Sequence, residues 1–381
     1  MTAGSRMPPL PDSTATSAGL AGADFTRQPF VLAWELTRAC NLACVHCRAE
    51  AQLQRHPGEL TTAEALAVID DIARFDVPPT LILTGGDPMR RADLVALIGH
   101  ATARGVRCTL TPAGTPLASP RRLAAVRDAG VQRIAISLDG ATAARHDAFR
   151  RVAGSFGWTL DIARDAAELG LPLQVHTTLC RRTVDDLPAI ADLVEALGAV
   201  VWAVFCLVPT GRAGVRDEVG PEMYEATFAW LAERSETARW SLKLTEGYHY
   251  RRFLAQQGRT PLPPREGPAG SRAPGPVNAG NGFCFISHTG DVCPSGFLPI
   301  VTGNVRDASV VALYRDHPVF RELRDPLLLK GKCGACPYQR LCGGSRSRAF
   351  VHTGDYLESD PACSYLPPGY DAGRPAHRPC V

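Results

Sequence analysis

Short apolar runs alternate with longer helix-like segments along most of the chain, and this alternation constrains the fold more than any other feature. The strand-like runs lie at residues 30–36, 80–84, 106–111, 133–138, 173–179 and 200–207. Helical spacing of apolar residues separates them, over about 61–75, 92–104, 119–129, 156–169 and 187–197. Such alternation is typical of parallel βαβ units. Six units predict an α/β fold, a partial (β/α)6 TIM-like barrel that carries its site at the carboxyl ends of the strands. Thr62 is the expected N-cap of the first helix.

Composition divides the chain into five segments. Residues 1–28 are rich in Ala, Ser, Thr and Pro and lack the apolar stretch of a signal peptide, so we expect a disordered tail. The barrel core should span 29–215, followed by a helical connection and a Pro- and Gly-rich linker at 216–282. A Cys-rich extension at 283–366 and a flexible tail at 367–381 complete the chain. The extension has little apolar periodicity, and such segments are often organised by metal.

Charge and hydropathy argue against two classes of partner. The 381 residues carry a formal net charge of +3, which is too small to indicate binding to nucleic acid. No run of about 20 apolar residues is present, so we expect no membrane span. Without a signal peptide the expected location is the cytoplasm, where thiols stay reduced.

Thirteen cysteines are many for a chain in a reducing compartment, and clustered cysteines there indicate metal rather than disulfides. Three lie close together near the first strand, and seven follow residue 283. Cys108, Cys180 and Cys206 stand alone within apolar runs, where we expect ordinary small core residues.

The first cysteine group, Cys40, Cys44 and Cys47, follows the first predicted strand with the spacing C-x3-C-x2-C. Three thiolates can hold a cubane iron–sulfur cluster and leave one iron free for another molecule. Free thiols or a zinc site are the alternatives, although structural zinc prefers four protein ligands. The motif resembles the signature of the radical S-adenosylmethionine (SAM) superfamily. The resemblance implies that these three catalytic cysteines bind a [4Fe–4S] cluster whose free iron chelates SAM.

Further strand-end motifs extend this resemblance. Residues 85–88, Gly-Gly-Asp-Pro, are similar to the family's GGE-type motif, whose backbone receives the amino group of SAM, with Asp87 in place of the usual Glu. Ser137 and Asp139 stand in a sequence similar to the SxDG motif that lines the SAM pocket. Arg150 could reach the SAM carboxylate, since Arg pairs well with carboxylates. A tight turn and a surface arginine are the alternative interpretations. The SAM-binding residues implied by the resemblance are Gly85, Gly86, Asp87, Pro88, Ser137, Asp139 and Arg150.

A second cysteine group lies in the C-terminal extension, with the spacing C-x2-C-x5-C-x20-C at Cys333, Cys336, Cys342 and Cys363. Four thiolates can complete a cubane without an open iron, and a zinc-ribbon site is the alternative. The spacing resembles that of radical SAM enzymes with SPASM or Twitch extensions. That resemblance implies one auxiliary [4Fe–4S] cluster.

Other cysteines of the extension fit a second auxiliary cluster less well. Seven-cysteine SPASM domains carry a further Cys where this chain has Arg346. Cys284 and Cys293 lie where other ligands of that cluster would be, and we expect two free thiols in a β-hairpin. Cys380, in the Pro-rich tail, should also be free.

The resemblance covers residues 34–363 and is closest to the group that includes alternative heme synthases, heme d1 biosynthesis enzymes and PQQ-type maturases. It implies an enzyme that reductively cleaves SAM to a 5′-deoxyadenosyl radical and removes hydrogen from its substrate. The reaction expected is oxidative decarboxylation of tetrapyrrole propionates. A maturase that modifies a ribosomally made peptide is the alternative, and a non-catalytic iron–sulfur electron carrier is a third.

The expected partners are a tetrapyrrole or peptide substrate and an external reductant such as flavodoxin or ferredoxin. Arg212, Arg346 and Arg348 are candidates to anchor propionates, although solvated surface arginines are the default interpretation. His46, inside the first cysteine motif, could tune the site or stack against it, and a structural role is the simpler interpretation.

Overall fold

A computed structural model describes residues 24–259 and 276–371 of the chain. Its ten strands form one sheet in the order β10-β9-β8-β1-β2-β3-β4-β5-β6-β7. The strands are β1 (Val31–Glu35), β2 (Thr80–Thr84), β3 (Cys108–Leu110), β4 (Val131–Ser137), β5 (Leu173–Leu179), β6 (Val201–Cys206), β7 (Ser241–Thr245), β8 (Phe283–Ile286), β9 (Asp291–Cys293) and β10 (Gly303–Asn304). Neighbouring strands from β8 through β1 to β7 are parallel, whereas β9 pairs antiparallel with both β8 and β10.

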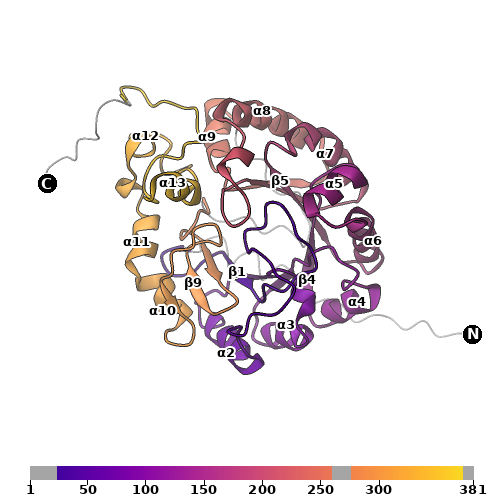
Figure 1. Ribbon diagram of the computed structural model, residues 1–381. Coiled ribbons are helices and arrows are strands. Elements are labelled where there is room, and N and C mark those ends of the chain that lie inside the picture. The colour runs from indigo at the N-terminus through magenta and orange to yellow at the C-terminus, as the bar shows by residue number, and fades with distance from the viewer. Residues whose placement is uncertain (1–23, 260–275, 372–381) are drawn as a thin grey trace, which may run out of the picture.

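Helices surround the outer side of this sheet, as Figure 1 shows. Those of the barrel and its connection are α2 (Thr62–Ile72), α3 (Leu94–Ala103), α4 (Pro120–Asp128), α5 (Ala143–Arg150), α6 (Ser155–Glu168), α7 (Leu187–Ala196), α8 (Pro221–Thr237) and α9 (His249–Gln256). The C-terminal helices α10 (Val310–Asp316), α11 (Pro318–Arg324), α12 (Gly331–Gly334) and α13 (Arg346–Thr353) occupy the arc between α9 and α2.

The α/β partial barrel predicted from the sequence is confirmed, and two further parallel strands extend it. β7 pairs with β6, and β8 pairs with β1 on the other side of the sheet. The sheet does not close, because β7 and β10 remain its two edges. The Cys-rich extension therefore begins as part of the barrel sheet. Residues 260–275 of the predicted linker and most of the predicted terminal tails lie outside the described residues.

Strand β1 is buried on both faces along its whole length, as a central strand of a parallel sheet requires. On β1, Leu32 and Trp34 join the main core, which they share with the surrounding helices. Ala33 instead joins a separate cluster with Phe285 and Cys293 of the β8–β9 hairpin. Alternate residues of one strand thus serve two cores, because successive side chains point to opposite faces.

The N-cap of the first helix lies one residue earlier than predicted. Thr61, not Thr62, is the N-cap of α2, and its hydroxyl accepts the Glu64 N–H at 3.3 Å. The Glu64 carboxylate accepts the Thr61 N–H at 2.7 Å in return, which completes a capping box. Thr62 is the first helical residue and donates its hydroxyl to Asp93 at 2.8 Å.

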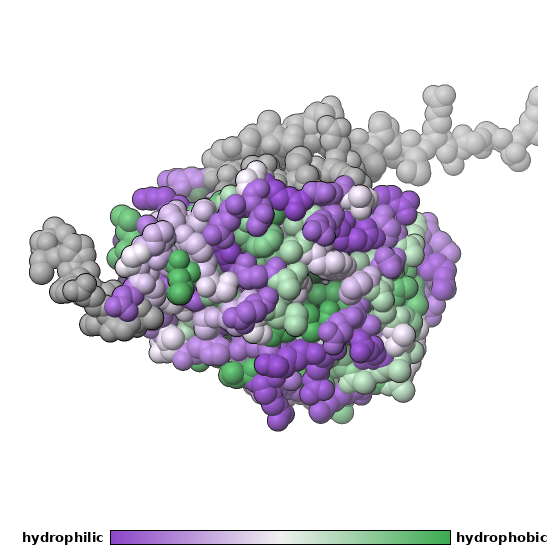
Figure 2. Space-filling model, turned by 90° about the horizontal axis from the view of Figure 1, so that it is seen from above, coloured by the Kyte–Doolittle hydropathy of each residue, from purple (hydrophilic) through white to green (hydrophobic). Residues whose placement is uncertain are grey.

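Hydrophilic side chains dominate the face of the molecule drawn in Figure 2, with hydrophobic residues in smaller patches between them. Among the described residues, no helix is both long and apolar enough to cross a bilayer.

Candidate functional site

The first three cysteines lie in the loop that follows β1, at the carboxyl ends of the strands. Cys40 and Cys44 are buried and Cys47 is half-buried, and all three pack into one small cluster. Each sulfur accepts one N–H: Leu42 N–H at 3.3 Å on Cys40, Arg150 Nη1 at 3.5 Å on Cys44, and Ala51 N–H at 3.4 Å on Cys47. Such contacts favour the thiolate form that an iron–sulfur cluster needs. The loop fits a group bound through three sulfurs.

Arg212 holds this loop in place. Its guanidinium donates to the carbonyl oxygens of Cys44, at 3.3 Å, and Ala51. The preceding Gly211 has φ +65°, and a Cβ there would lie 2.4 Å from the carbonyl oxygen of Cys47. Only glycine fits this approach. Arg212 therefore supports the cysteine loop. These contacts do not favour the role of propionate anchor expected from the sequence.

The glycine pair after β2 packs against the backbone that leads to Cys40. The Gly86 N–H donates to the Thr37 carbonyl at 2.7 Å, and a Cβ on Gly86 would lie 2.6 Å from the Ala39 carbonyl oxygen. Asp87 is fully buried, and its carboxylate accepts the Thr115 hydroxyl at 2.7 Å. Burial raises the pKa of Asp87. Pro88 then begins a short 3-10 turn. These contacts place Gly85–Pro88 beside the cysteine loop, and their role toward SAM stays a prediction.

Arg150 and Asp139 form a buried ion pair beside Cys44. Asp139 also accepts the Thr178 N–H at 2.6 Å, and Ser137 ends β4 two residues earlier. Burial alone would raise the pKa of Asp139, but the Arg150 charge and further contacts, among them the Thr178 N–H, together outweigh burial and lower the pKa. Arg150 Nε has no hydrogen-bond partner among the described residues. Arg150 is thus a buried residue of the site rather than a surface arginine, and its contact with the SAM carboxylate stays a prediction.

His46 stacks on Phe149, with the ring centroids 4.5 Å apart. Burial lowers the pKa of His46 to about 4, so its ring is neutral at physiological pH. The stacking supports the structural role predicted for this side chain.

The four C-terminal cysteines line one hollow. The Asp360 N–H donates to Cys333 Sγ at 3.4 Å, and the Gly344 N–H donates to Cys342 Sγ at 3.4 Å. Within residues 24–259 and 276–371, no three His, Cys, Asp or Glu side chains converge as ligands of a single metal ion. Four thiols around a shared hollow fit a cluster that is bound at its corners.

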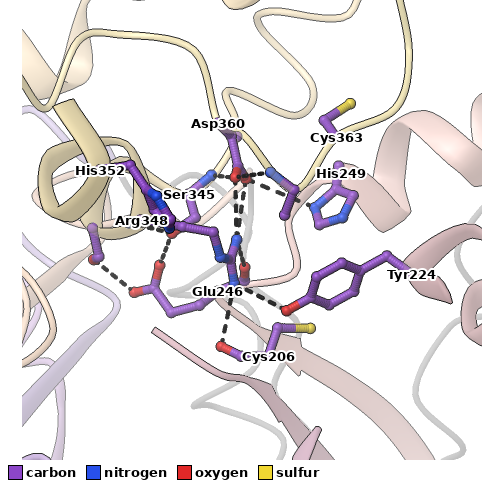
Figure 3. A network of polar contacts seen from close by, with 12 residues as sticks. Cys206, Tyr224, Glu246, His249, Ser345, Arg348, His352, Asp360 and Cys363 are labelled. Carbon is purple, nitrogen blue, oxygen red and sulfur yellow. Dashed lines mark hydrogen bonds and ion pairs between the residues drawn. The ribbon is translucent and has the colours of Figure 1, made fainter. Parts of the chain in front are cut away.

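Arg348 ties this cysteine segment to the barrel, as Figure 3 shows. Its guanidinium donates to the carbonyl of Leu207, at 3.0 Å, just after β6, and pairs with Asp360 at 3.2 Å. Burial would raise the pKa of Asp360, but the Arg348 charge, together with smaller contributions such as the Ser345 and Ala362 N–H groups, lowers it to about 2. Asp360 in turn precedes Cys363 by three residues and donates its N–H to Cys333. The ion pair therefore fixes the backbone between two of the cysteines.

Glu246 supports the same network from the end of β7. Its carboxylate accepts the hydroxyls of Ser345 and, at 3.0 Å, Ser347. The backbone of Glu246 has φ +58°, in the left-handed region that non-glycine residues seldom occupy, and the surrounding contacts hold it there.

Arg346 and Arg348 correct the expectation that these arginines anchor propionates. They are 2% and 1% exposed. Arg346 donates to the carbonyls of Tyr356, at 2.9 Å, and Glu358, at 2.7 Å. Both guanidiniums are committed to partners inside the protein.

The predicted hairpin around Cys284 and Cys293 is present as β8 and β9. Cys284 is buried in the main core, whereas Cys293 packs with Ala33 and Phe285 in the separate cluster. The two thiols lie on opposite faces of the sheet, which does not suit ligands of one cluster. Cys380 lies outside the described residues.

Sequence reasoning missed two residues of the C-terminal site, Arg252 and Asp360. Arg252 Nη2 lies 3.6 Å from Cys363 Sγ, although α9 is far from the cysteines in sequence. A weak signal for Asp360 was present in the sequence, because this residue lies three positions before Cys363. No sequence pattern pointed to Arg252.

Comparisons with known proteins agree with this geometry. Residues 34–194 match the family described as Radical SAM superfamily. An AdoMet-dependent heme synthase of Methanosarcina barkeri (strain Fusaro / DSM 804) is 41% identical over 349 residues, which cover 90% of this chain and 98% of that protein. AdoMet is another abbreviation for SAM. Mycofactocin maturase MftC of Mycobacterium ulcerans (strain Agy99) is 32% identical over 364 residues, which cover 93% of each chain.

The fold also matches a solved structure, Streptococcus suis SuiB bound to precursor peptide SuiA. The TM-score is 0.65 over 89% of this chain and 76% of that chain. The sequences are only 14% identical, so this likeness concerns the fold alone.

Proposed function

The chain belongs to the radical SAM superfamily, and on this premise we propose that it oxidatively decarboxylates propionate side chains of a tetrapyrrole. Enzymes of this family use a [4Fe–4S] cluster and SAM, and the chain is an enzyme of this class. The observation that carries the finer proposal is the 41% identity to a heme synthase over 98% of that protein's length. Each of the two cysteine groups also surrounds a site that suits a cluster.

We assign the first cluster to Cys40, Cys44 and Cys47. When bound, it supplies the electron that splits SAM into methionine and a 5′-deoxyadenosyl radical. Arg212 keeps the loop in shape, and Arg150 donates to Cys44 Sγ at 3.5 Å. The glycine turn at Gly85 and Gly86 leaves backbone, rather than side chains, beside the loop. These residues would hold SAM and exclude water from the radical.

The proposed reaction releases one electron for each carboxyl group that is lost. The radical takes a hydrogen atom from the propionate carbon next to the ring and becomes 5′-deoxyadenosine. The propionate then loses its carboxylate as CO2, a vinyl group forms, and one electron leaves. We assign the acceptor to an auxiliary [4Fe–4S] cluster held by Cys333, Cys336, Cys342 and Cys363, which line one hollow.

A peptide maturase is the second candidate. The 32% identity to a mycofactocin maturase, over 93% of each chain, favours it. The higher identity to the heme synthase ranks the tetrapyrrole first. A non-catalytic electron carrier is set aside, because the family is enzymatic.

We also propose that the protein works in a reducing compartment and receives its electrons from an external donor. All twelve cysteines of the described residues are free thiols, as the cytoplasm would keep them. A flavodoxin or ferredoxin would supply the electron to the first cluster.

Mass spectrometry of an anaerobic reaction tests the substrate. The reaction contains the reconstituted, reduced protein, SAM and iron-coproporphyrin III. We expect stepwise loss of propionate carboxyls together with 5′-deoxyadenosine, and neither product from a Cys44→Ala variant. Deoxyadenosine with an unchanged porphyrin would overturn the substrate and favour a peptide.

A further inference from the structure

Two buried arginines reach sulfurs of the C-terminal hollow from opposite parts of the chain. Arg346 Nη2, at the start of α13, lies 3.6 Å from Cys333 Sγ. Arg252 Nη2, on α9, lies 3.6 Å from Cys363 Sγ. The two side chains are 2% and 3% exposed. Long cationic side chains are seldom buried so fully without a compensating charge.

Among the described residues, Arg346 forms no ion pair with a carboxylate. Its remaining contacts are to main-chain carbonyls, those of Gly344, Tyr356 and Glu358. Asp355, whose pKa the Arg346 charge helps to lower, is paired directly with Lys330 instead. A buried cation without a counter-charge is costly. A cluster bound by four thiolates carries net negative charge, and it would supply the missing partner.

Arg252 is held so that it faces Cys363. Glu225 of α8 binds its guanidinium through both carboxylate oxygens, with Arg252 Nη1 to Glu225 Oε2 at 3.0 Å. The guanidinium also lies over the ring of Tyr365, 5.6 Å from its centroid. Planar bidentate pairing fixes the direction of the donor atoms. Nη2 therefore serves Glu225 and Cys363 together.

We propose that Arg346 and Arg252 raise the reduction potential of the auxiliary cluster, so that it accepts the electron released when the substrate loses CO2. An added electron makes the cluster more negative, and nearby cations and N–H donors to sulfur stabilise the reduced form more than the oxidised form. The cluster is reduced by one electron as the substrate radical is oxidised by one. A soluble one-electron carrier then reoxidises the cluster. The inference rests on the auxiliary cluster of the proposed function.

The test isolates that cluster in the full-length chain. Replacing Cys40, Cys44 and Cys47 with Ala removes the first site, and iron and sulfide analysis after anaerobic reconstitution counts what remains. About four irons and four sulfides per chain are expected for one cubane cluster. A chain that holds zinc or no iron would overturn the auxiliary cluster itself, and with it this inference.

A redox titration followed by electron paramagnetic resonance then measures the midpoint potential. Arg346→Gln and Arg252→Gln should each lower the equilibrium constant for reduction about tenfold, which is about 59 mV for a one-electron couple. The matched control is Arg340→Gln, which removes an exposed charge between Cys336 and Cys342 and should leave the potential unchanged.

A purely structural role for the two arginines makes a different prediction. In that case the variants bind less iron or unfold more readily, but the cluster that remains keeps its potential. An unchanged potential with full iron content would overturn the proposal. If Arg346→Gln loses the cluster, the potential of Arg252→Gln tests the proposal instead. Arg252 comes from α9, and among the described contacts it bonds no carbonyl of the cysteine segment. A lowered potential in that variant supports the proposal, and an unchanged one contradicts it.

Discussion

At the scale of single residues, Glu35 connects three parts of the first site. It is 1% exposed and ends β1. One carboxylate oxygen binds Arg48 Nη2 at 2.6 Å, next to Cys47, and the other lies 2.7 Å from His288 Nδ1 in the turn of the β8–β9 hairpin. Burial would raise the pKa of Glu35, but Arg48 and His288 outweigh it and lower the pKa to about 2.

Replacing Glu35 with Gln should therefore destabilise the protein. We expect the free energy of unfolding to fall by about 3 kcal/mol at pH 7, because Arg48 is left half-buried without its partner. The lowered pKa means that Glu35 stabilises the fold above its ordinary value of 4.5 and loses this effect as pH falls toward 2. The difference in the free energy of unfolding between wild type and Glu35→Gln should therefore shrink as pH falls from 4.5 to about 2. Denaturant unfolding of the cluster-free chain measures it, with the exposed Glu233→Gln as control. Equal losses in the two variants would refute this account.

The arginines mark the limit of sequence reasoning at this scale. The cysteines could be predicted as two groups because their spacing is local, and the structure brings each group together. Arg346 and Arg348 could not be predicted as buried, since their partners are main-chain carbonyls and an aspartate from loops and strand ends. Arg252 bonds across more than 100 residues, with 111 positions separating it from Cys363.

At the scale of elements, the capping box of α2 is a clear test of how the first helix begins. Thr61→Ala removes the hydroxyl that accepts the Glu64 N–H. We expect a loss of about 1 kcal/mol in the free energy of unfolding. Thr62→Ala, one residue into the helix, should cost less than half as much, because it removes only a surface contact to Asp93. Chemical denaturation measures the loss in the free energy of unfolding for both variants. A larger loss for Thr62→Ala would instead support Thr62 as the N-cap predicted from the sequence.

The alternation of strands and helices could be predicted for the first six strands because each is an apolar run. β7 was missed because Lys243 interrupts its short apolar pattern. The pairing of β8 with β1 was missed for a different reason. Val31 lies opposite Phe283, and no local pattern reveals contact between residues so far apart in sequence. Such pairing brings together segments that are far apart along the chain, which a local pattern does not encode.

At the scale of the whole molecule, one sheet positions both cysteine sites. The loop after β1 carries the first group, and Arg348 bonds the backbone after β6 while Asp360 holds the second. Both sites thus depend on the carboxyl ends of strands in one sheet, as expected for an α/β barrel. This arrangement fits an enzyme that generates a radical at one site and removes an electron at the other.

The most direct test of this account follows one hydrogen atom. Iron-coproporphyrin III carrying deuterium on the propionate carbon next to the ring is incubated anaerobically with the reduced protein and SAM. We predict that 5′-deoxyadenosine gains one deuterium for each carboxyl group lost, as mass spectrometry would record. Deoxyadenosine that stays free of deuterium while the propionates remain intact would contradict the central claim.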